Sequence, residues 1–355
     1  MDDDKWKTRE QRLLDRPRNT RKDAKIEMRT EGKSLHLKDF FRVVWRFSRA
    51  LPLDALCLCL VAVPANRAAS KEVEITPAKP VVESEPNVVA QSAAAIDSFS
   101  GEFLFVKNEN AIQYPASSTK ILTALLVIEA GDLDKLVTVE LSDTKVEPSN
   151  LELKPGEQYT RRQLLYGLML KSANDVAMAL ARDNAGSVEA FAEKMNRRAS
   201  ELGATNSHFA NPNGLHEPDH YTTAHDLALI ARAAMEQPFF RQVVSTIYYS
   251  WKSPKGVVYQ LRNHNRLLRH FAGCNGLKTG FTRAAQQVLV SSALREGHEV
   301  ISVVLHTDKP GIWEDSKTLL TYGLTKVGCS PVTIAHSSER ASEKEDAAGE
   351  GDEAH

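Results

Sequence analysis

A serine and a lysine three residues apart stand at the start of an apolar stretch. The segment Tyr114–Lys120 reads YPASSTK and runs directly into ILTALLVIEA. Because residues i and i+3 share one face of a helix, Lys120 would lie beside the Ser117 hydroxyl. A buried, neutral lysine can accept the proton of a serine and make that serine a nucleophile. The alternative is that Ser117 caps a helix and Lys120 solvates its first turn.

Two further short motifs follow in the chain. Ser172-Ala173-Asn174 lies where one helical pattern ends and another begins, and Lys278-Thr279-Gly280 precedes a late strand pattern. Each alone is typical of a capping loop or a surface turn. Together with the first motif they form the ordered set Ser-x-x-Lys, Ser-x-Asn, Lys-Thr-Gly of penicillin-binding proteins and class A β-lactamases. The combination predicts one shared site for nucleophilic serine catalysis.

Longer matches make the resemblance more specific. From about Ala93 to Gly328 the chain resembles serine-type D-Ala-D-Ala carboxypeptidases, the low-molecular-mass class of penicillin-binding proteins. The matching stretches are AAAIDSFSGEFLFVKNENAIQYPASSTKILTALLVIEAG, LMLKSANDVAMALA, FANPNGLHEPDHYTTAHDLALIARAA and RNHNRLLRHFAGCNGLKTGFTRAA, followed by LVSSA and ISVVL. The resemblance implies removal of the terminal D-Ala from peptidoglycan stem peptides, with β-lactams as inhibitors.

The resemblance also implies a role for each motif residue. Ser117 would attack the carbonyl of the penultimate D-Ala, and Lys120 would be its base if burial and the nearby cation Lys278 depress the lysine pKa. Ser172 would relay a proton to the leaving amine. Asn174 would hydrogen-bond the substrate or steady Lys120.

Substrate binding is expected along the KTG strand. The lysine and threonine of KTG would hold the terminal carboxylate, and the backbone N–H groups of Ser117 and Phe281 would form an oxyanion hole. Arg283 is a second candidate for the carboxylate. The chemistry needs no metal or other cofactor. The expected substrate-binding residues are Lys278, Thr279, Gly280, Phe281 and Arg283.

Two positions depart from the family pattern. Many relatives have an arginine before the strand that here reads ISVVL, and Glu299 stands at the matching position. After KTG the chain has Ala285-Gln286-Gln287, where relatives often have Ala-Gly and an aromatic or basic residue. Substrate preference is expected to differ accordingly.

Three other functions are alternatives to a D-Ala-D-Ala carboxypeptidase. A class A β-lactamase adds a glutamate in an ExxLN-like loop, and no such sequence lies between Asn174 and Lys278; the stretch 201–204 does not fit. A D,D-endopeptidase of peptidoglycan cross-links would use the same residues and stays open. A non-enzymatic binder of cell-wall peptides is disfavoured because every motif side chain is present.

A zinc site is the alternative use of four neighbouring histidines, His208, His216, His220 and His225. His216-x-x-x-His220 has ligand spacing, but the stretch is a loop rich in Pro, Gly and Asn without cysteine. No metal is expected there.

Composition divides the chain into parts. Among 355 residues the net charge of −1 gives no overall attraction to nucleic acid or membrane. Residues 1–49 carry 15 Lys and Arg against 9 Asp and Glu, whereas residues 337–355 carry 2 against 7. The expected parts are a disordered basic extension (1–49), a signal-peptide h-region with its cleavage site (50–69), a linker (70–91), the D,D-peptidase catalytic domain (92–329) and a disordered acidic tail (330–355).

The expected signal peptide predicts where the protein is located in the cell. Arginines precede the nine apolar residues Ala55–Val63, which are too few for the roughly 20 that cross a bilayer, and Val63-Pro64-Ala65 offers a cleavage site. A buried helix is the alternative. Initiation at Met28 would explain the late position, and a precursor peptide from residues 1–27 would contradict that hypothesis. We expect secretion to the periplasm or cell envelope, with no strong membrane anchor unless the signal stays uncleaved.

The order of the expected elements predicts an α+β fold, in which both chain ends build one antiparallel sheet with helices on its faces and a helical subregion. The resemblance implies that this fold is of the β-lactamase/D,D-peptidase type. Cleavage of the signal leaves two cysteines, Cys274 and Cys329, which we favour as separate thiols. The expected strands are 93–96, 102–107, 288–294 and 299–306. The expected helices are 117–131, 161–170, 175–181, 187–202, 224–235 and 312–324.

Overall fold

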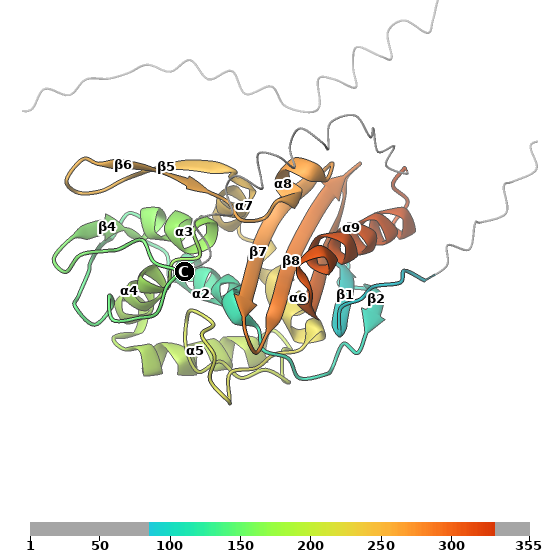
Figure 1. The fold of residues 1–355 in the computed structure, drawn as a ribbon, viewed down its shortest axis with the longest axis horizontal. Helices are drawn as coiled ribbons and strands as arrows, with labels where there is room; N and C mark the ends of the chain where they lie inside the picture. The colour runs from blue at the N-terminus through green and yellow to red at the C-terminus, as the bar shows by residue number, and fades with distance from the viewer. Residues whose placement is uncertain (1–84, 331–355) are drawn as a thin grey trace, which may run out of the picture. The chain divides into compact units, whose positions relative to one another are not determined.

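A five-stranded antiparallel sheet forms the centre of the protein, for which the structure, a computed structural model, describes residues 85–330 (Figure 1). The strands run in the order β2-β1-β9-β8-β7, so the first strands in sequence lie beside the last. Their bounds are Ser92–Asp97 (β1), Phe103–Lys107 (β2), Cys274–Thr282 (β7), Gln286–Arg295 (β8) and His298–Thr307 (β9). The expected α+β fold with a sheet from both chain ends is confirmed.

Side chains of the sheet alternate between two apolar layers. On β1, Ala93 and Ala95 belong to one buried cluster, whereas Ala94 and Ile96 belong to the other. Helix α9 (Lys309–Lys326) covers the first face and α6 (Ala224–Met235) packs on the second (Figure 1). Because helices bury both faces of the sheet, β1, β8 and β9 are buried along most of their length, and their apolar runs, such as AAAI and ISVVL, indicated strands in the sequence.

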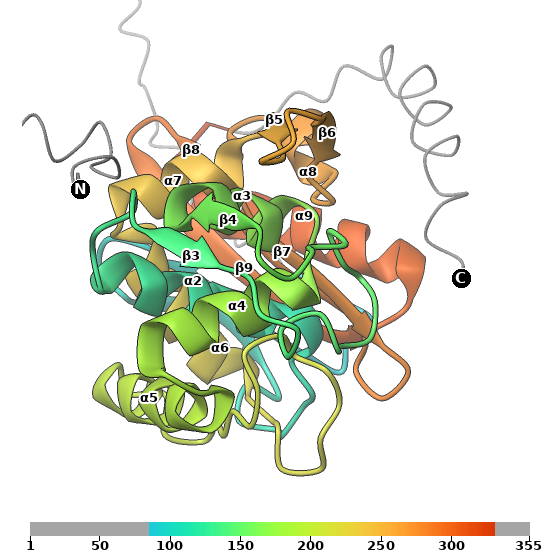
Figure 2. The same cartoon turned by 90° about the vertical axis from the view of Figure 1, so that its left-hand side faces the viewer.

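Most of the remaining helices lie beside the sheet and face the viewer in Figure 2, whereas the short helix Leu267–His270 packs on β7. The short 3₁₀ turn η2 precedes α2, whose residues from Lys120 to Val127 are all buried. The bounds are Ala116–Thr119 (η2), Lys120–Glu129 (α2), Arg161–Leu170 (α3), Asn174–Ala185 (α4), Val188–Glu201 (α5), Pro238–Ser245 (α7) and Leu267–His270 (α8). Thus the expected helix from Ser117 begins as a 3₁₀ turn, and the Ser117 side chain caps neither element.

Side-chain caps fix where several helices begin. Thr160 and Gln163 form a reciprocal capping box at the start of α3. The Thr223 side chain accepts from the Asp226 N–H at the start of α6, and Asp308 accepts from Gly311 N–H at 2.6 Å at the start of α9. These polar residues place the helix starts to within a few residues of the expected positions.

Four short strands and α7 complete the described elements. Strands β3 (Leu136–Thr138) and β4 (Gln158–Thr160) pair with each other, as do β5 (Tyr248–Lys252) and β6 (Val258–Arg262). The β5–β6 hairpin and α7 were not predicted. Only Trp251 is buried on β5 and only Leu261 on β6, so the hairpin has almost no alternating pattern to detect.

The packed part of the chain begins earlier than the expected linker boundary at residue 91. Val88 and Ala90 are buried, and the Asp315 carboxylate accepts from Val89 N–H at 3.0 Å and Ala90 N–H at 2.8 Å. The sequence concealed this because the partner lies more than 220 residues away. The expected basic extension, the signal, residues 70–84 of the linker and residues 331–355 of the tail lie outside the described residues.

Asp315→Ala should destabilise the protein by about 2 kcal/mol, because two N–H groups of the 88–90 segment would lose their buried acceptor. Glu314→Ala is the matched control, since its side chain is 69% exposed and pairs with Lys317 on the same helix. Denaturant unfolding of both variants and the parent gives the comparison. Equal unfolding free energies for the two variants would contradict this role of Asp315.

Candidate active site

The turn that carries Ser117 is held in an unusual backbone conformation. Ala116 has φ of +46°, a left-handed conformation that is rare for a residue with a side chain. Its neighbours Ser118 and Thr119 are buried, and the Ser118 hydroxyl donates to Pro115 O at 2.6 Å. Ser117 is partly exposed and therefore faces out of a turn that is otherwise packed.

Lys120 lies wholly buried one helical turn from that serine. Its Nζ contacts Ser117 Oγ at 3.0 Å, Asn174 Oδ1 at 2.7 Å and Asn213 O at 2.6 Å. Burial holds the pKa of Lys120 well below its ordinary value, the positive charge of Lys278 lowers it further, and Asp175 opposes the shift. The amine is thus placed, and biased toward its neutral form, to accept the serine proton.

Asn174 enters the site at the junction of α3 and α4. Its Nδ2 donates to Glu147 O at 2.9 Å and its backbone N–H to Ser149 O at 2.7 Å, which leaves Oδ1 for Lys120. Ser172 lies two residues earlier, buried, with φ of +63°. In the part of the chain that the structure describes, no hydrogen bond joins its hydroxyl to the serine or lysine.

A carboxylate that the sequence analysis missed holds the loop above this junction. Asp175 accepts hydrogen bonds from the backbone N–H groups of Leu151, Leu153 and Val176. Burial raises the pKa of Asp175, although these N–H donors act in the opposite direction. The loop that supplies the carbonyls to Asn174 is thereby fixed to the start of α4.

The KTG strand approaches the serine through its glycine. A methyl group at Gly280 would lie 2.9 Å from Ser117 N and 3.1 Å from the Ala116 side chain, so only glycine allows β7 this close. Lys278 is buried on the same strand, near enough to depress the Lys120 pKa, and its Nζ donates to Thr279 O at 2.9 Å.

The last two expected substrate residues follow at the solvent-exposed end of β7. Phe281 is 57% exposed, and its N–H belongs to the strand next to Ser117 N. Arg283 is exposed in the turn between β7 and β8. The structure therefore brings Ser117, Lys120, Asn174 and Gly280 into contact, and leaves Arg283 on the rim.

The loop 209–214 supplies a further contact that the sequence analysis missed. The Asn213 carbonyl accepts from Lys120, and Gly214, with φ of +88°, packs against Ala116 so closely that a methyl group would lie 1.8 Å from Ala116 O. This stretch matched the family loop, but a contact made by a backbone carbonyl leaves no residue type to detect.

Glu299 has a structural role at the other end of β7. It is buried, its Oε2 accepts from Arg241 Nη2 at 2.7 Å, and its Oε1 accepts from Asn275 Nδ2 at 2.8 Å. Burial alone would raise the pKa of Glu299, but these donors lower it. The glutamate joins α7, β7 and β9, away from the Ser117 side of the strand.

The cysteines and histidines form other arrangements. Cys274 and Cys329 are free thiols, and burial raises the pKa of Cys274 to about 12. Within residues 85–330, no cluster of three or more His, Cys, Asp or Glu side chains is arranged to hold a metal ion. His220 instead bonds to Thr119 and Ala210.

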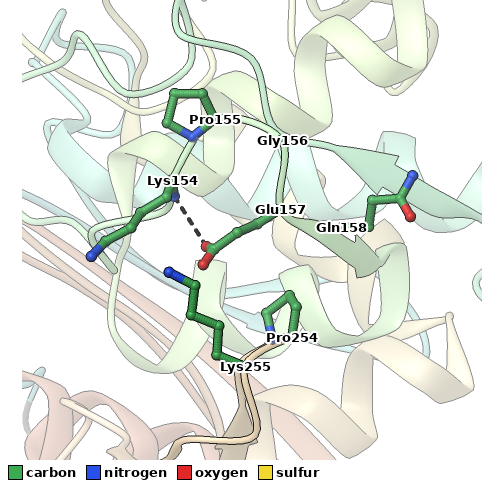
Figure 3. Close-up of a pocket in the computed structure, with 7 residues that line it drawn as sticks. All are labelled: Lys154, Pro155, Gly156, Glu157, Gln158, Pro254 and Lys255. Carbon is green, nitrogen blue, oxygen red and sulfur yellow. Dashed lines mark hydrogen bonds between the residues drawn. The ribbon is translucent and has the colours of Figure 1, made fainter.

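A separate groove lies between the loop before β4 and the tip of the β5–β6 hairpin (Figure 3). It encloses about 440 Å³, and Lys154 and Lys255 stand on its two sides, with Glu157 accepting from Lys154 N–H at 3.1 Å. None of the motif residues lines it, so this groove is distinct from the Ser117 site.

Comparison with known proteins decides the family. A family model described as D-alanyl-D-alanine carboxypeptidase matches residues 79–309. The chain belongs to the D-alanyl-D-alanine carboxypeptidase family. It is therefore a hydrolase of the kind that cleaves between two D-alanines.

Named relatives and solved structures agree with the family. The carboxypeptidase DacB2 of Mycobacterium tuberculosis is 36% identical over 244 residues, which cover 67% of this chain and 83% of the relative. DacF of Bacillus subtilis is 35% identical and aligns over 62% of this chain and 58% of its own length. The crystal structure of the Streptomyces K15 DD-transpeptidase is similar with a TM-score of 0.65 and 34% identity, covering 68% of this chain and 99% of that one.

Gly214→Ala should lower kcat/KM for D-alanine release from a D-Ala-D-Ala peptide by about 100-fold, because the added methyl displaces the Ser117 turn. Gly156→Ala is the control: φ is +87° there too, but open space surrounds the added methyl. Both variants bear the same backbone strain, so only the clash separates them. Equal activities for the two, with thermal unfolding measured alongside, would contradict the packing of Gly214 on the turn.

Proposed function

We propose that this chain removes the terminal D-Ala from peptidoglycan stem peptides through an acyl-enzyme on Ser117. The contact of the buried Lys120 amine with Ser117 Oγ at 3.0 Å carries the proposal. A serine hydroxyl needs a base, and Lys120 is the amine within reach whose pKa is depressed. Ser117, Lys120, Ser172 and Asn174 are the proposed catalytic residues.

The first half of the reaction forms an ester. The Ser117 hydroxyl proton passes to Lys120 as Oγ bonds to the carbonyl carbon of the penultimate D-Ala. Backbone N–H groups of Ser117 and Phe281 receive the developing oxyanion. When the intermediate collapses, the C–N bond breaks, and the leaving D-Ala amine takes the proton of Lys120 through the Ser172 hydroxyl, which returns the lysine to its neutral form. Asn174 keeps Lys120 in place during these transfers.

The second half consumes water. Water attacks the ester carbon, loses its proton to Lys120, and expels Ser117 Oγ, which recovers its proton. The products are the shortened peptide and the regenerated enzyme. Lys278 and Thr279 bind the terminal carboxylate of the substrate, and Arg283 on the rim is the second cation for it. No metal or other cofactor takes part in this scheme.

We place the enzyme in the periplasm or cell envelope, where peptidoglycan lies, and take residues 50–69 as a signal peptide. Across residues 85–330, the structure contains no helix of the length and apolarity that a membrane crossing requires.

Intact mass after mixing with benzylpenicillin tests the nucleophile. The parent should carry one persistent adduct and Ser117→Ala none, because within residues 85–330 the Ser117 hydroxyl is the one that contacts the base. Ser142→Ala, in an exposed loop, should be acylated like the parent.

Each other outcome favours an alternative. Rapid return to unmodified protein with loss of penicillin would indicate a β-lactamase, and no adduct on the parent would indicate a silent binder. Cleavage of cross-linked muropeptide dimers faster than D-Ala release from pentapeptides would favour the endopeptidase.

The pH dependence of acylation tests the base. Lys120 accepts a proton only when neutral, so acylation should decline as the pH falls through its depressed pKa. Lys278→Gln removes a like charge, which raises the Lys120 pKa and should shift this acid limb to higher pH. Lys255→Gln, at the exposed hairpin tip, should leave the limb in place. An unshifted limb in Lys278→Gln would exclude Lys120 as the titrating base.

A further inference from the structure

His220 links the serine–lysine turn to the loop that holds Lys120 from the other side. The ring is buried, with Phe209 packed at its edge and ring centroids 5.6 Å apart. Its Nδ1 lies 3.1 Å from Ala210 N and its Nε2 lies 2.8 Å from Thr119 Oγ1. Thr119 directly precedes Lys120, and Ala210 follows Phe209 in the loop 209–214.

The hydrogen bonds fix the state of the ring. The backbone N–H of Ala210 can only donate, so Nδ1 must be an acceptor and carries no proton. Nε2 therefore holds the proton of the neutral ring and donates it to Thr119 Oγ1. Burial lowers the pKa of His220 to about 4, and His208, Lys120 and His216 add to the effect while Asp219 opposes it. The ring thus stays neutral near pH 7.

The loop it holds makes the third contact of the lysine. Asn213 O accepts from Lys120 Nζ, and the preceding Pro212 O accepts from Thr123 Oγ1 at 2.7 Å. At the other end, the Asn196 side chain brackets Phe209, with Oδ1 2.7 Å from its N–H and Nδ2 3.0 Å from its carbonyl oxygen. Between these two anchors, the His220 ring connects Ala210 of the loop to Thr119 of the serine–lysine turn.

We propose that His220 is a positioning residue for the catalytic lysine: by tying Ala210 to Thr119, it holds the Asn213 carbonyl against the Lys120 amine and keeps water from that amine. The proposal rests on the proposed role of Lys120 as base. It does not require His220 to touch the substrate or to transfer a proton.

The test compares four variants with the parent by their rates of acylation with benzylpenicillin across pH. His220→Ala removes both hydrogen bonds, so the loop loosens, water reaches Lys120, and the lysine pKa rises toward its ordinary value. We expect the acid limb to move to higher pH and the rate at pH 7 to fall about tenfold. The glutamine side chain of His220→Gln offers an oxygen acceptor and an N–H donor, so this variant should restore most of the acylation rate at pH 7 and most of the parent's acid-limb position.

His208→Gln is the matched control. This exposed histidine lies on the same loop pair, and its Nδ1 contacts Asp219 O rather than the serine–lysine turn. In His208→Gln the acid limb should stay at the pH of the parent, and the acylation rate at pH 7 should stay within twofold of the parent. Thr119→Val, which breaks only the Nε2 contact, should shift the limb in the same direction as His220→Ala and serves if that variant fails to fold.

The outcomes separate this proposal from the proposed function. If the parent itself is not acylated, the proposed function fails. If the parent is acylated but His220→Ala and Thr119→Val change only the unfolding temperature, with limb and rate intact, His220 is merely structural and the inference is overturned. The same holds if His220→Gln shifts the limb as far as His220→Ala.

Discussion

The burial of the Lys120 amine is the constraint on which the site depends. An ammonium group removed from water is strongly disfavoured unless acceptors replace the lost solvation, so a buried lysine tends toward its neutral form. Here three oxygens surround Nζ, from Ser117, Asn174 and Asn213. They satisfy the amine in either protonation state without supplying a formal negative charge. The result is a lysine that can both take and return a proton.

Two charged neighbours set the balance from opposite sides. Lys278 lowers the Lys120 pKa and Asp175 raises it, and both are buried. Asp175 is itself occupied by backbone N–H donors, which stabilise its negative charge and leave its attraction for the lysine a secondary effect. Desolvation therefore dominates, and the tertiary structure must keep water out from every direction. This explains why separate segments of the chain converge on one amine.

How much of this could be predicted from sequence depends on which groups carry the information. Side-chain motifs were informative: Ser117 and Lys120 meet as their i, i+3 spacing predicted, and Asn174 joins them as the ordered motif set implied. The apolar runs at both chain ends indicated the strands of the sheet. Contacts made by backbone atoms could not be predicted from the sequence, because every residue has a carbonyl oxygen. The Asn213 contact belongs to this class.

Long-range pairing explains the other differences. Asp175 was missed because its partners are N–H groups more than 20 residues earlier. The Glu299 departure suggested a changed substrate contact, but its partner Arg241 comes from α7, a helix too short to show a period. In each case the residue type was visible and its partner was not.

Close packing of backbone segments against the Ser117 turn allows a buried lysine to act on a substrate that arrives from solvent. Ser117 is partly exposed while Lys120 is buried, although the two residues are only one helical turn apart. Side chains around that turn would either cover the serine or admit water beside the lysine. Gly214 and Gly280 avoid both, since each lets another segment lie against the turn at backbone distance. The left-handed conformation at Ala116 is retained because packing on both sides leaves the turn no alternative.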